Sequence, residues 1–173
     1  SSPNTPTVTG VSLTWVQVNT VTYASIDVPT SRVTLFRALG TPTTGALTID
    51  FASQTQTNCQ WSWGEFSSVV TSGTNGSGAI IQSATGQVAL GASTTCLVTL
   101  AAFSSANNAT AGGFGWRQQT ATQLTVGSGF TLIARNAAST PKLGIISEFR
   151  NDNDTTVDAD DADFNHGAGI AVE

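Results

Sequence analysis

The chain has few of the residues that bind nucleic acids, hold metal ions or cross membranes. Its 173 residues include six Lys and Arg, one His, two Cys and no Met, and the formal net charge is −5. The shortage of basic residues argues against nucleic-acid binding, which needs a positive face for the phosphates. No apolar run approaches the roughly 18 to 20 residues of a membrane-spanning helix, and no signal-peptide core opens the chain. The sequence therefore predicts neither a nucleic-acid partner nor a membrane span.

Methionine is absent even from the first position, where Ser1 stands. We expect such a chain to be processed, excised from a longer protein, or missing its first residues. Residues 1–10 contain Pro3 and Pro6 and are predicted to form an extended arm rather than a strand.

The residues that are abundant favour β-structure. Thr is common throughout, and β-branched side chains pack well on a pleated sheet. Apolar and polar residues alternate with a period of two in many segments, whereas a sustained helical period is absent. The predicted strands are 11–18, 20–28, 32–38, 46–52, 59–66, 79–83, 94–103, 112–117, 129–135, 142–149 and 167–172.

These strands are short, and the gaps between them contain turn residues such as Pro29, Asn75-Gly76 and Thr140-Pro141. About eleven antiparallel strands at this spacing predict an all-β sandwich. No repeat or low-complexity linker divides the chain, so we expect a single domain over residues 1–173.

Cys59 and Cys96 are the only cysteines, and each lies in an alternating segment on a face predicted to be inward. A disulfide between them would close a long loop and stabilise the fold by roughly 3 to 4 kcal/mol. Two buried free thiols are equally consistent with the pattern, because Cys is among the most buried residue types. Both alternatives stay open at this point.

Acidic residues gather near the end of the chain, where eight of the eleven Asp and Glu lie in residues 148–173. The densest oxygen-ligand cluster is a candidate calcium site and consists of Asp158, Asp160, Asp161, Asp163 and Asn165. The spacing does not match a known calcium loop, because Gly167 and Glu173 stand one position late. A solvated acidic loop that aids solubility is the favoured alternative.

Four Trp residues raise the question of a sugar-binding surface. Trp61 and Trp63 share a face with Cys59 and are predicted to lie in the core, as is Trp15. Trp116 lies in a Gly-rich context beside Arg117 and is the candidate for an exposed glycan-stacking residue.

Catalytic patterns are hard to find. A glycosidase needs two carboxylates that face each other across the substrate, but Glu65 has no second acid near it along the chain. We expect Glu65 to pair with a base such as Arg37 instead. His166 is the only imidazole and no nucleophile-elbow sequence is present, so a Ser-His-Asp hydrolase is not expected. The sequence predicts a protein that is not an enzyme.

The alternating segments resemble a jelly-roll, concanavalin-like β-sandwich family that is common in phage and metagenomic sequences. The resemblance is carried by PTVTG (6–10) with LTW (13–15), RVTLFRA (32–38), GALTIDF (45–51), WSWGEF (61–66), GTNGSGAIIQ (73–82), LVTLAAF (97–103), GFTL (129–132) and GIAVE (169–173). It implies a jelly-roll fold, and it implies a structural role at a virion surface, as in capsid decoration.

The chain departs from that family in two places. Related sequences carry one or two apolar strands ahead of the PTVTG piece, so the resemblance implies that the sandwich lacks its first strands here. An unpaired strand edge invites association, and a removed segment or a neighbouring subunit would fill the gap. The acidic segment 158–165 is the other departure, because a plainer Thr-rich strand is expected there.

Together these observations predict a non-catalytic structural or decoration protein that is exposed on a virion or another extracellular assembly. Its partners would be other copies of itself or a neighbouring shell protein. The alternative hypothesis is a carbohydrate-binding, lectin-like module that uses Trp116 and, through the acidic segment, calcium.

Overall fold

The computed structural model describes residues 2–25, 28–89, 92–118, 123–161 and 164–173. In these residues it contains one short 3-10 helix, η1 (Thr74–Ala79), and is otherwise built from strands and coil. The strands are β1 (Thr7–Gly10), β2 (Val16–Ser25), β3 (Val28–Arg37), β4 (Leu47–Asp50), β5 (Ser83–Val88), β6 (Thr95–Thr99), β7 (Thr110–Gln118), β8 (Thr125–Val126), β9 (Thr131–Ser139), β10 (Lys142–Arg150), β11 (Thr156–Asp160) and β12 (Phe164–Val172).

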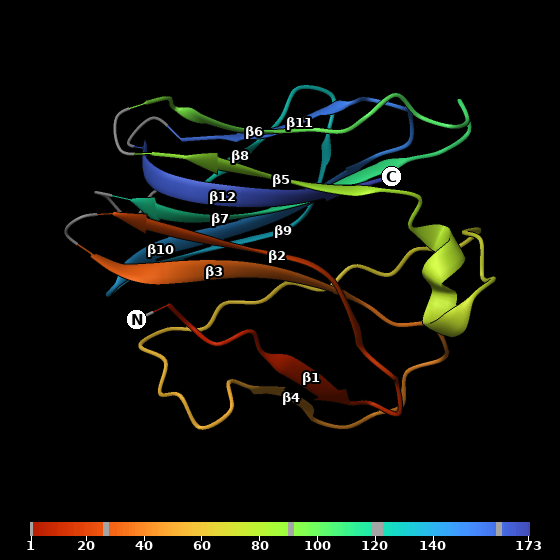
Figure 1. The fold of residues 1–173 in the computed structure, drawn as a ribbon, viewed down its shortest axis with the longest axis horizontal. Helices are drawn as coiled ribbons and strands as arrows, with labels where there is room; N and C mark the ends of the chain where they lie inside the picture. Colours follow the sequence, from red (N-terminus) through yellow and green to blue (C-terminus); the bar gives the residue numbers. More distant parts are fainter. Residues whose placement is uncertain (1, 26–27, 90–91, 119–122, 162–163) are drawn as a thin grey trace.

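The strands lie in layers (Figure 1). The central layer is a five-stranded sheet in the order β5-β12-β7-β10-β9, and a three-stranded sheet in the order β6-β11-β8 lies above it. Below the central sheet lies the β2–β3 hairpin, and the two-stranded β1–β4 sheet lies further down. All the strand pairs in the described residues are antiparallel. The predicted all-β, antiparallel fold is therefore confirmed.

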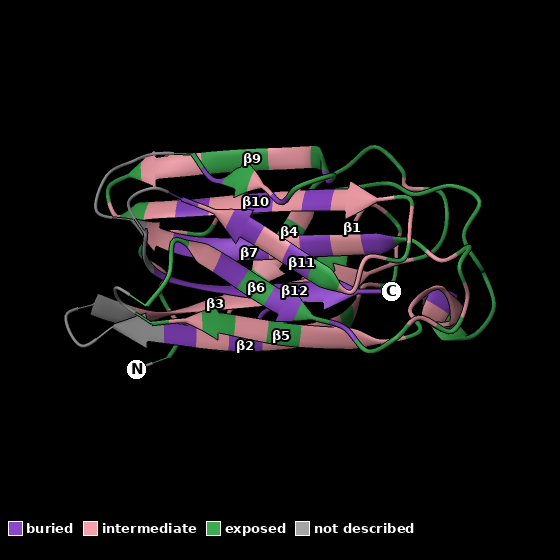
Figure 2. Ribbon diagram, turned by 90° about the horizontal axis from the view of Figure 1, so that it is seen from above, coloured by how far each residue is buried: buried purple, intermediate pink, exposed green. Residues whose placement is uncertain are grey.

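The upper core fills the space between the three-stranded and five-stranded sheets. Its side chains are almost completely buried and include Phe114 and Trp116 from β7, Ile146 from β10 and Val98 from β6. Burial alternates with exposure along β6, as a strand with one face on a core requires (Figure 2). Each such side chain contributes roughly 1.5 to 3 kcal/mol to folding.

Glycine makes room for the largest ring of this core. Gly169 on β12 lies directly opposite Phe114 on β7, and a Cβ at position 169 would stand 2.3 Å from two ring carbons of Phe114. No real Cβ contact is that short, so the ring occupies the space that a larger residue would need.

The lower face of the central sheet has a second, smaller core. Val21 and Tyr23 of β2 pack against Ala168 and Ile170 of β12, with Val33 and Leu35 of β3 beside them. The β2–β3 hairpin therefore covers the part of this face that β5, β12 and β7 form. The rest of the face, formed by β10 and β9, is covered differently.

A long coil over residues 51–73 covers β10 and β9. The Gln60 side chain donates a hydrogen bond to the Leu143 carbonyl at 3.5 Å, Gly64 approaches Ile133, and Phe66 contacts Phe149. Across residues 55–71, no backbone group is hydrogen-bonded to the backbone of another described residue. This part of the layer is therefore held by side chains and not by a strand ladder.

Several predicted strands differ from those observed. Segments 11–18 and 20–28 correspond to one strand, β2, which follows a turn with positive φ at Val11 and Ser12. Residues 7–10, predicted as part of an extended arm, form β1 and pair with β4. Segment 59–66 was predicted as a strand but is coil, and β11 overlaps the first three residues of the acidic segment 158–165.

Candidate functional site

Large apolar side chains are exposed along the coil that covers β10 and β9. Trp61 and Val70 are 58% and 57% exposed, and Val69 is 45% exposed. We call these three residues the apolar strip. Side chains of this kind usually lie in a core, and their exposure on one stretch of chain is typical of a surface that contacts another molecule.

A pocket of about 420 Å³ lies between the same coil and the central sheet. Its walls come from three elements that are far apart in the sequence: the coil, β9 and β10. The lining residues are Trp63, Gly64, Glu65, Phe66, Ser67, Ile133, Phe149 and Asn151. Trp61 and the rest of the apolar strip are not among them, so the strip and the pocket are separate surfaces of one segment.

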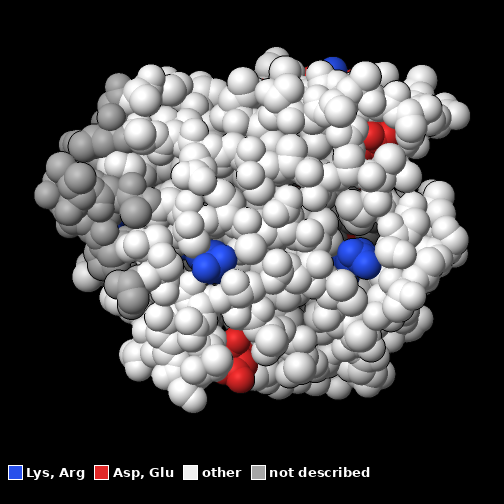
Figure 3. All heavy atoms as spheres, viewed as in Figure 1, with Lys and Arg blue, Asp and Glu red and all other residues white. Residues whose placement is uncertain are grey.

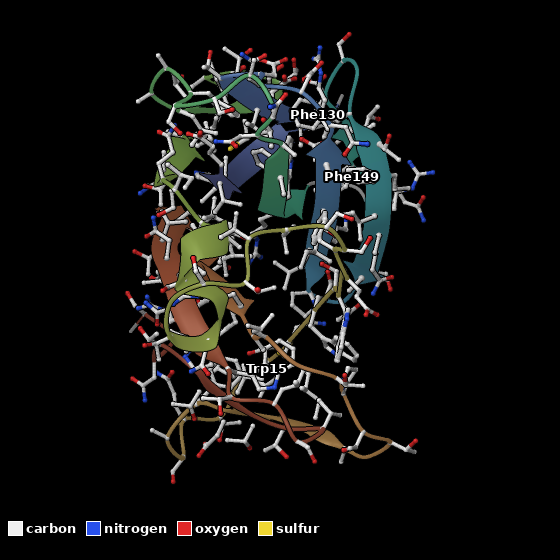
Figure 4. All side chains as sticks on the ribbon, turned by 90° about the vertical axis from the view of Figure 1, so that its right-hand side faces the viewer. Trp15, Phe130 and Phe149 are labelled. Atoms are coloured by element: carbon white, nitrogen blue, oxygen red, sulfur yellow. The ribbon has the colours of Figure 1, made fainter. Side chains whose placement is uncertain are left out.

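Two edge-to-face aromatic contacts hold the pocket wall. The rings of Phe66 and Phe149 meet at 6.0 Å between centroids and 81° between planes, and those of Trp15 and Trp63 at 5.4 Å and 79°. Such contacts contribute about 0.5 to 1.5 kcal/mol beyond burial. Figure 4 shows Trp15 below the coil and Phe149 on β10 above it. The contacts therefore tie the coil to the β1–β2 connection on one side and to the central sheet on the other.

Gly64 lets the coil lie close to β9. A Cβ at this position would stand 3.3 Å from Phe66 Cε2 and 3.4 Å from Ile133 Cγ2. A Cβ there would press on these two side chains, so glycine gives the tightest fit between the coil and β9.

The pocket combines aromatic surface with polar groups that are not basic. Trp63, Phe66 and Phe149 provide rings, while Glu65, Asn151 and Ser67 provide a carboxylate, an amide and a hydroxyl. Of the residues that the structure describes, Glu65 is the only acid in the lining, so these residues do not bring together the two carboxylates that a glycosidase uses.

The tryptophans lie where the sequence did not predict them. Trp116 is fully buried in the upper core, so its ring face is not accessible to a sugar, and the prediction of an exposed stacking residue there is wrong. Trp61 and Trp63, predicted to be in the core, are 58% and 38% exposed. The reason is that 59–66 has no strand partner, so its alternation does not bury one face. Glu65 is exposed and forms no ion pair with Arg37 in the described chain.

The two cysteines are free thiols on different surfaces. Cys96 is buried in the upper core, whereas Cys59 lies exposed in the coil below the central sheet. Burial raises the pKa of the Cys96 thiol to about 12 and also raises the pKa of Cys59. No disulfide joins the pair in this structure, because the five-stranded sheet separates the two segments.

The acidic segment is partly a strand. Val157 and Ala159 of β11 are fully buried, and the alternating Asp158 and Asp160 are only partly exposed. The Asp160 carboxylate accepts a hydrogen bond from the Thr95 hydroxyl, and Asp161 is buried. Asp163 and the side chain of Asn165 lie outside the described residues. The alternation in Val157-Asp158-Ala159-Asp160 is the signal from which this strand could have been predicted.

No group of three or more His, Cys, Asp and Glu side chains in the described residues is arranged to hold a metal ion. Calcium binding by Asp158, Asp160, Asp161, Asp163 and Asn165 stays a prediction. His166 is buried on β12, where burial and the nearby Arg117 lower its pKa.

Glu148 is a buried acid that the sequence did not single out. Its side chain is fully buried in the upper core; Oε2 accepts a hydrogen bond from the Gly127 N–H at 3.0 Å, and Oε1 has no hydrogen-bond partner among the described residues. Burial, and to a smaller extent the charges of Asp158 and Asp160, raise the pKa of the Glu148 carboxyl to about 8, against the effect of the Gly127 bond. Position 148 follows Ile146 on the inward face of β10, which is the signal for its burial.

The nearby Arg150 contacts two acids, Asp152 and Asp154, in the connection between β10 and β11. It forms ion pairs with Asp152 at 2.6 Å and Asp154 at 2.5 Å, and its guanidinium lies 5.8 Å from the centre of the Phe130 ring. The Arg150 charge is therefore directed to the β10–β11 turn.

Comparison with known proteins found no matching family model, no similar curated protein and no similar solved structure. In the described residues, the structure contains no helix that is long and apolar enough to span a membrane.

Proposed function

We propose that this chain is a non-catalytic structural protein that works by surface contact in an extracellular or virion-type assembly, with other copies of the chain as its partners. The observation that carries the proposal is the exposure of the apolar strip, Trp61, Val69 and Val70. Burying such side chains against a partner stabilises an interface by roughly 25 cal/mol for each Å² removed from water.

The low surface charge supports the same proposal. The face shown in Figure 3 carries few Lys, Arg, Asp or Glu side chains. Charged residues are depleted at the centres of protein interfaces, because each charge must lose its water when the interface forms. Two parts of this proposal, the jelly-roll topology and the viral setting, rest on the sequence resemblance described above.

The coil also offers a way to assemble. Backbone groups of residues 55–71 have no backbone partner among the described residues, and the sequence of 59–66 has the alternation of a strand. A strand-like segment without a backbone partner is a template for strand addition. A neighbouring copy that pairs here would cover the strip at the same time.

Sedimentation velocity over a range of concentrations tests the proposal. We expect the chain to associate, and we expect the double variant W61S/V70S to associate more weakly. The matched control is Leu97→Ser, because Leu97 is 47% exposed on β6, on the other side of the molecule. A chain that stays monomeric at every concentration, or that loses association equally with the control, contradicts the proposal.

A further inference from the structure

The pocket has a composition that contact between copies does not require. Its rings come from Trp63, Phe66 and Phe149, and its polar groups from Glu65, Ser67 and Asn151. An interface between copies also uses aromatic residues, but it does not need a concave surface that mixes rings with hydrogen-bonding groups. Binding sites for small ligands combine these two features.

We propose that this pocket binds a neutral saccharide, and this goes beyond the contact role proposed above. A pyranose ring presents C–H groups on its faces and hydroxyls around its edge. The C–H face matches the exposed rings of Trp63 and Phe66, and the hydroxyls match the carboxylate of Glu65, the amide of Asn151 and the hydroxyl of Ser67. A volume of about 420 Å³ is within the range of ligand pockets, about 300 to 1,000 Å³.

The charges of the pocket select against anionic ligands. No Lys, Arg or His among the described residues lines it, and Glu65 would repel a sulfate, phosphate or carboxylate group. Arg150, which precedes Asn151 in the chain, is engaged with Asp152 and Asp154. The site therefore fits an uncharged sugar better than a sialylated or sulfated one.

The wall of the pocket is preorganised. Trp63 is held by Trp15, and Phe66 by Phe149, in edge-to-face contacts. Rings held in place before binding lose less conformational freedom when a ligand stacks on them. Phe149 lies near the end of β10, where its backbone is paired with β7 on one side and β9 on the other.

A glycan array with neutral and acidic saccharides, followed by titration calorimetry on the sugars that bind, tests this assignment. We expect binding to neutral glycans. Phe66→Ala removes a ring from the wall and should weaken binding about tenfold or more. Glu65→Gln removes only the charge and one acceptor and should weaken binding less than Phe66→Ala does.

Trp61→Ala is the matched control. Trp61 is an exposed tryptophan two residues from Trp63, but it does not line the pocket, so this variant should bind sugar like the wild type. Near-ultraviolet circular dichroism shows whether each variant is folded. Three results would overturn the assignment: no neutral glycan bound, binding unchanged in both pocket variants, or capture of a proline-rich peptide in place of sugar. A monomeric chain that still binds sugar would leave this assignment standing while contradicting the contact role.

Discussion

The two faces of the five-stranded sheet are covered in different ways. Above it, another sheet closes over side chains such as Phe114 and Trp116, which have no exposed surface. Below it, β10 and β9 are covered by a coil whose Phe66 is 48% exposed. The upper face therefore supplies stability, and the lower face presents groups that can interact with other molecules. Both candidate surfaces, the apolar strip and the pocket, belong to the lower face.

Truncating one phenylalanine on each face gives the largest expected contrast. Phe114→Ala should reduce the free energy of unfolding by about 3 to 5 kcal/mol, because it leaves a cavity in a closed core. Phe66→Ala should reduce it by about 1 kcal/mol or less, because the ring is half exposed and the coil can relax. Chemical denaturation of both variants measures the difference. Equal losses would show that the coil is as tightly packed as the upper core.

The core above the five-stranded sheet contains the buried carboxyl of Glu148, whose ionisation lowers the free energy of unfolding. Because folding raises its pKa to about 8, the folded state binds a proton that the unfolded state releases at lower pH. The stability contributed by this proton is complete below the ordinary pKa of Glu and is lost as the pH rises towards 8. His166 acts in the opposite direction as the pH rises, since its pKa is lowered by folding.

Comparison of the wild type with Glu148→Gln isolates this effect. The variant keeps an acceptor for the Gly127 N–H but carries no charge. Between pH 5.5 and 7.5 the wild type should lose about 2 to 3 kcal/mol of unfolding free energy relative to the variant. Denaturation curves at both pH values give this difference, and a constant difference would show that Glu148 is not titrating in this range.

The reactivity of the two cysteines compares the two faces without any substitution in the chain. A thiol reagent added to the native protein near pH 8 should modify Cys59 slowly and leave Cys96 unmodified, because Cys59 is exposed and Cys96 is buried with a pKa of about 12. After denaturation both should react. If neither thiol reacts in the native protein, and neither reacts after denaturation without a reductant, the two cysteines form a disulfide and this structure is contradicted.

The sequence predicted the regular strands better than the surface that matters for function. Alternation placed β3, β7 and β10 close to their observed positions, because these strands have at least one face on a core. The same alternation gave the wrong result for segment 59–66. Period-two patterning shows that a chain can form a strand, but it does not show that a partner strand is present. Trp61 and Trp63 were placed in the core for that reason.

The pocket could not be predicted from sequence, because its walls come from 63–67, from Ile133 and from the end of β10. Which strands lie under the coil is set by the sheet order, and local patterns do not contain that order. Glu148 is different: it follows Ile146 on the inward face of β10, so its burial was readable from spacing alone.

The fit between Gly169 and Phe114 links two strands that meet only when the chain is folded. As homologous sequences drift, position 169 can gain a side chain only if the ring at 114 becomes smaller, so the two sites should covary. That coupling would identify distant relatives whose overall identity is too low to detect.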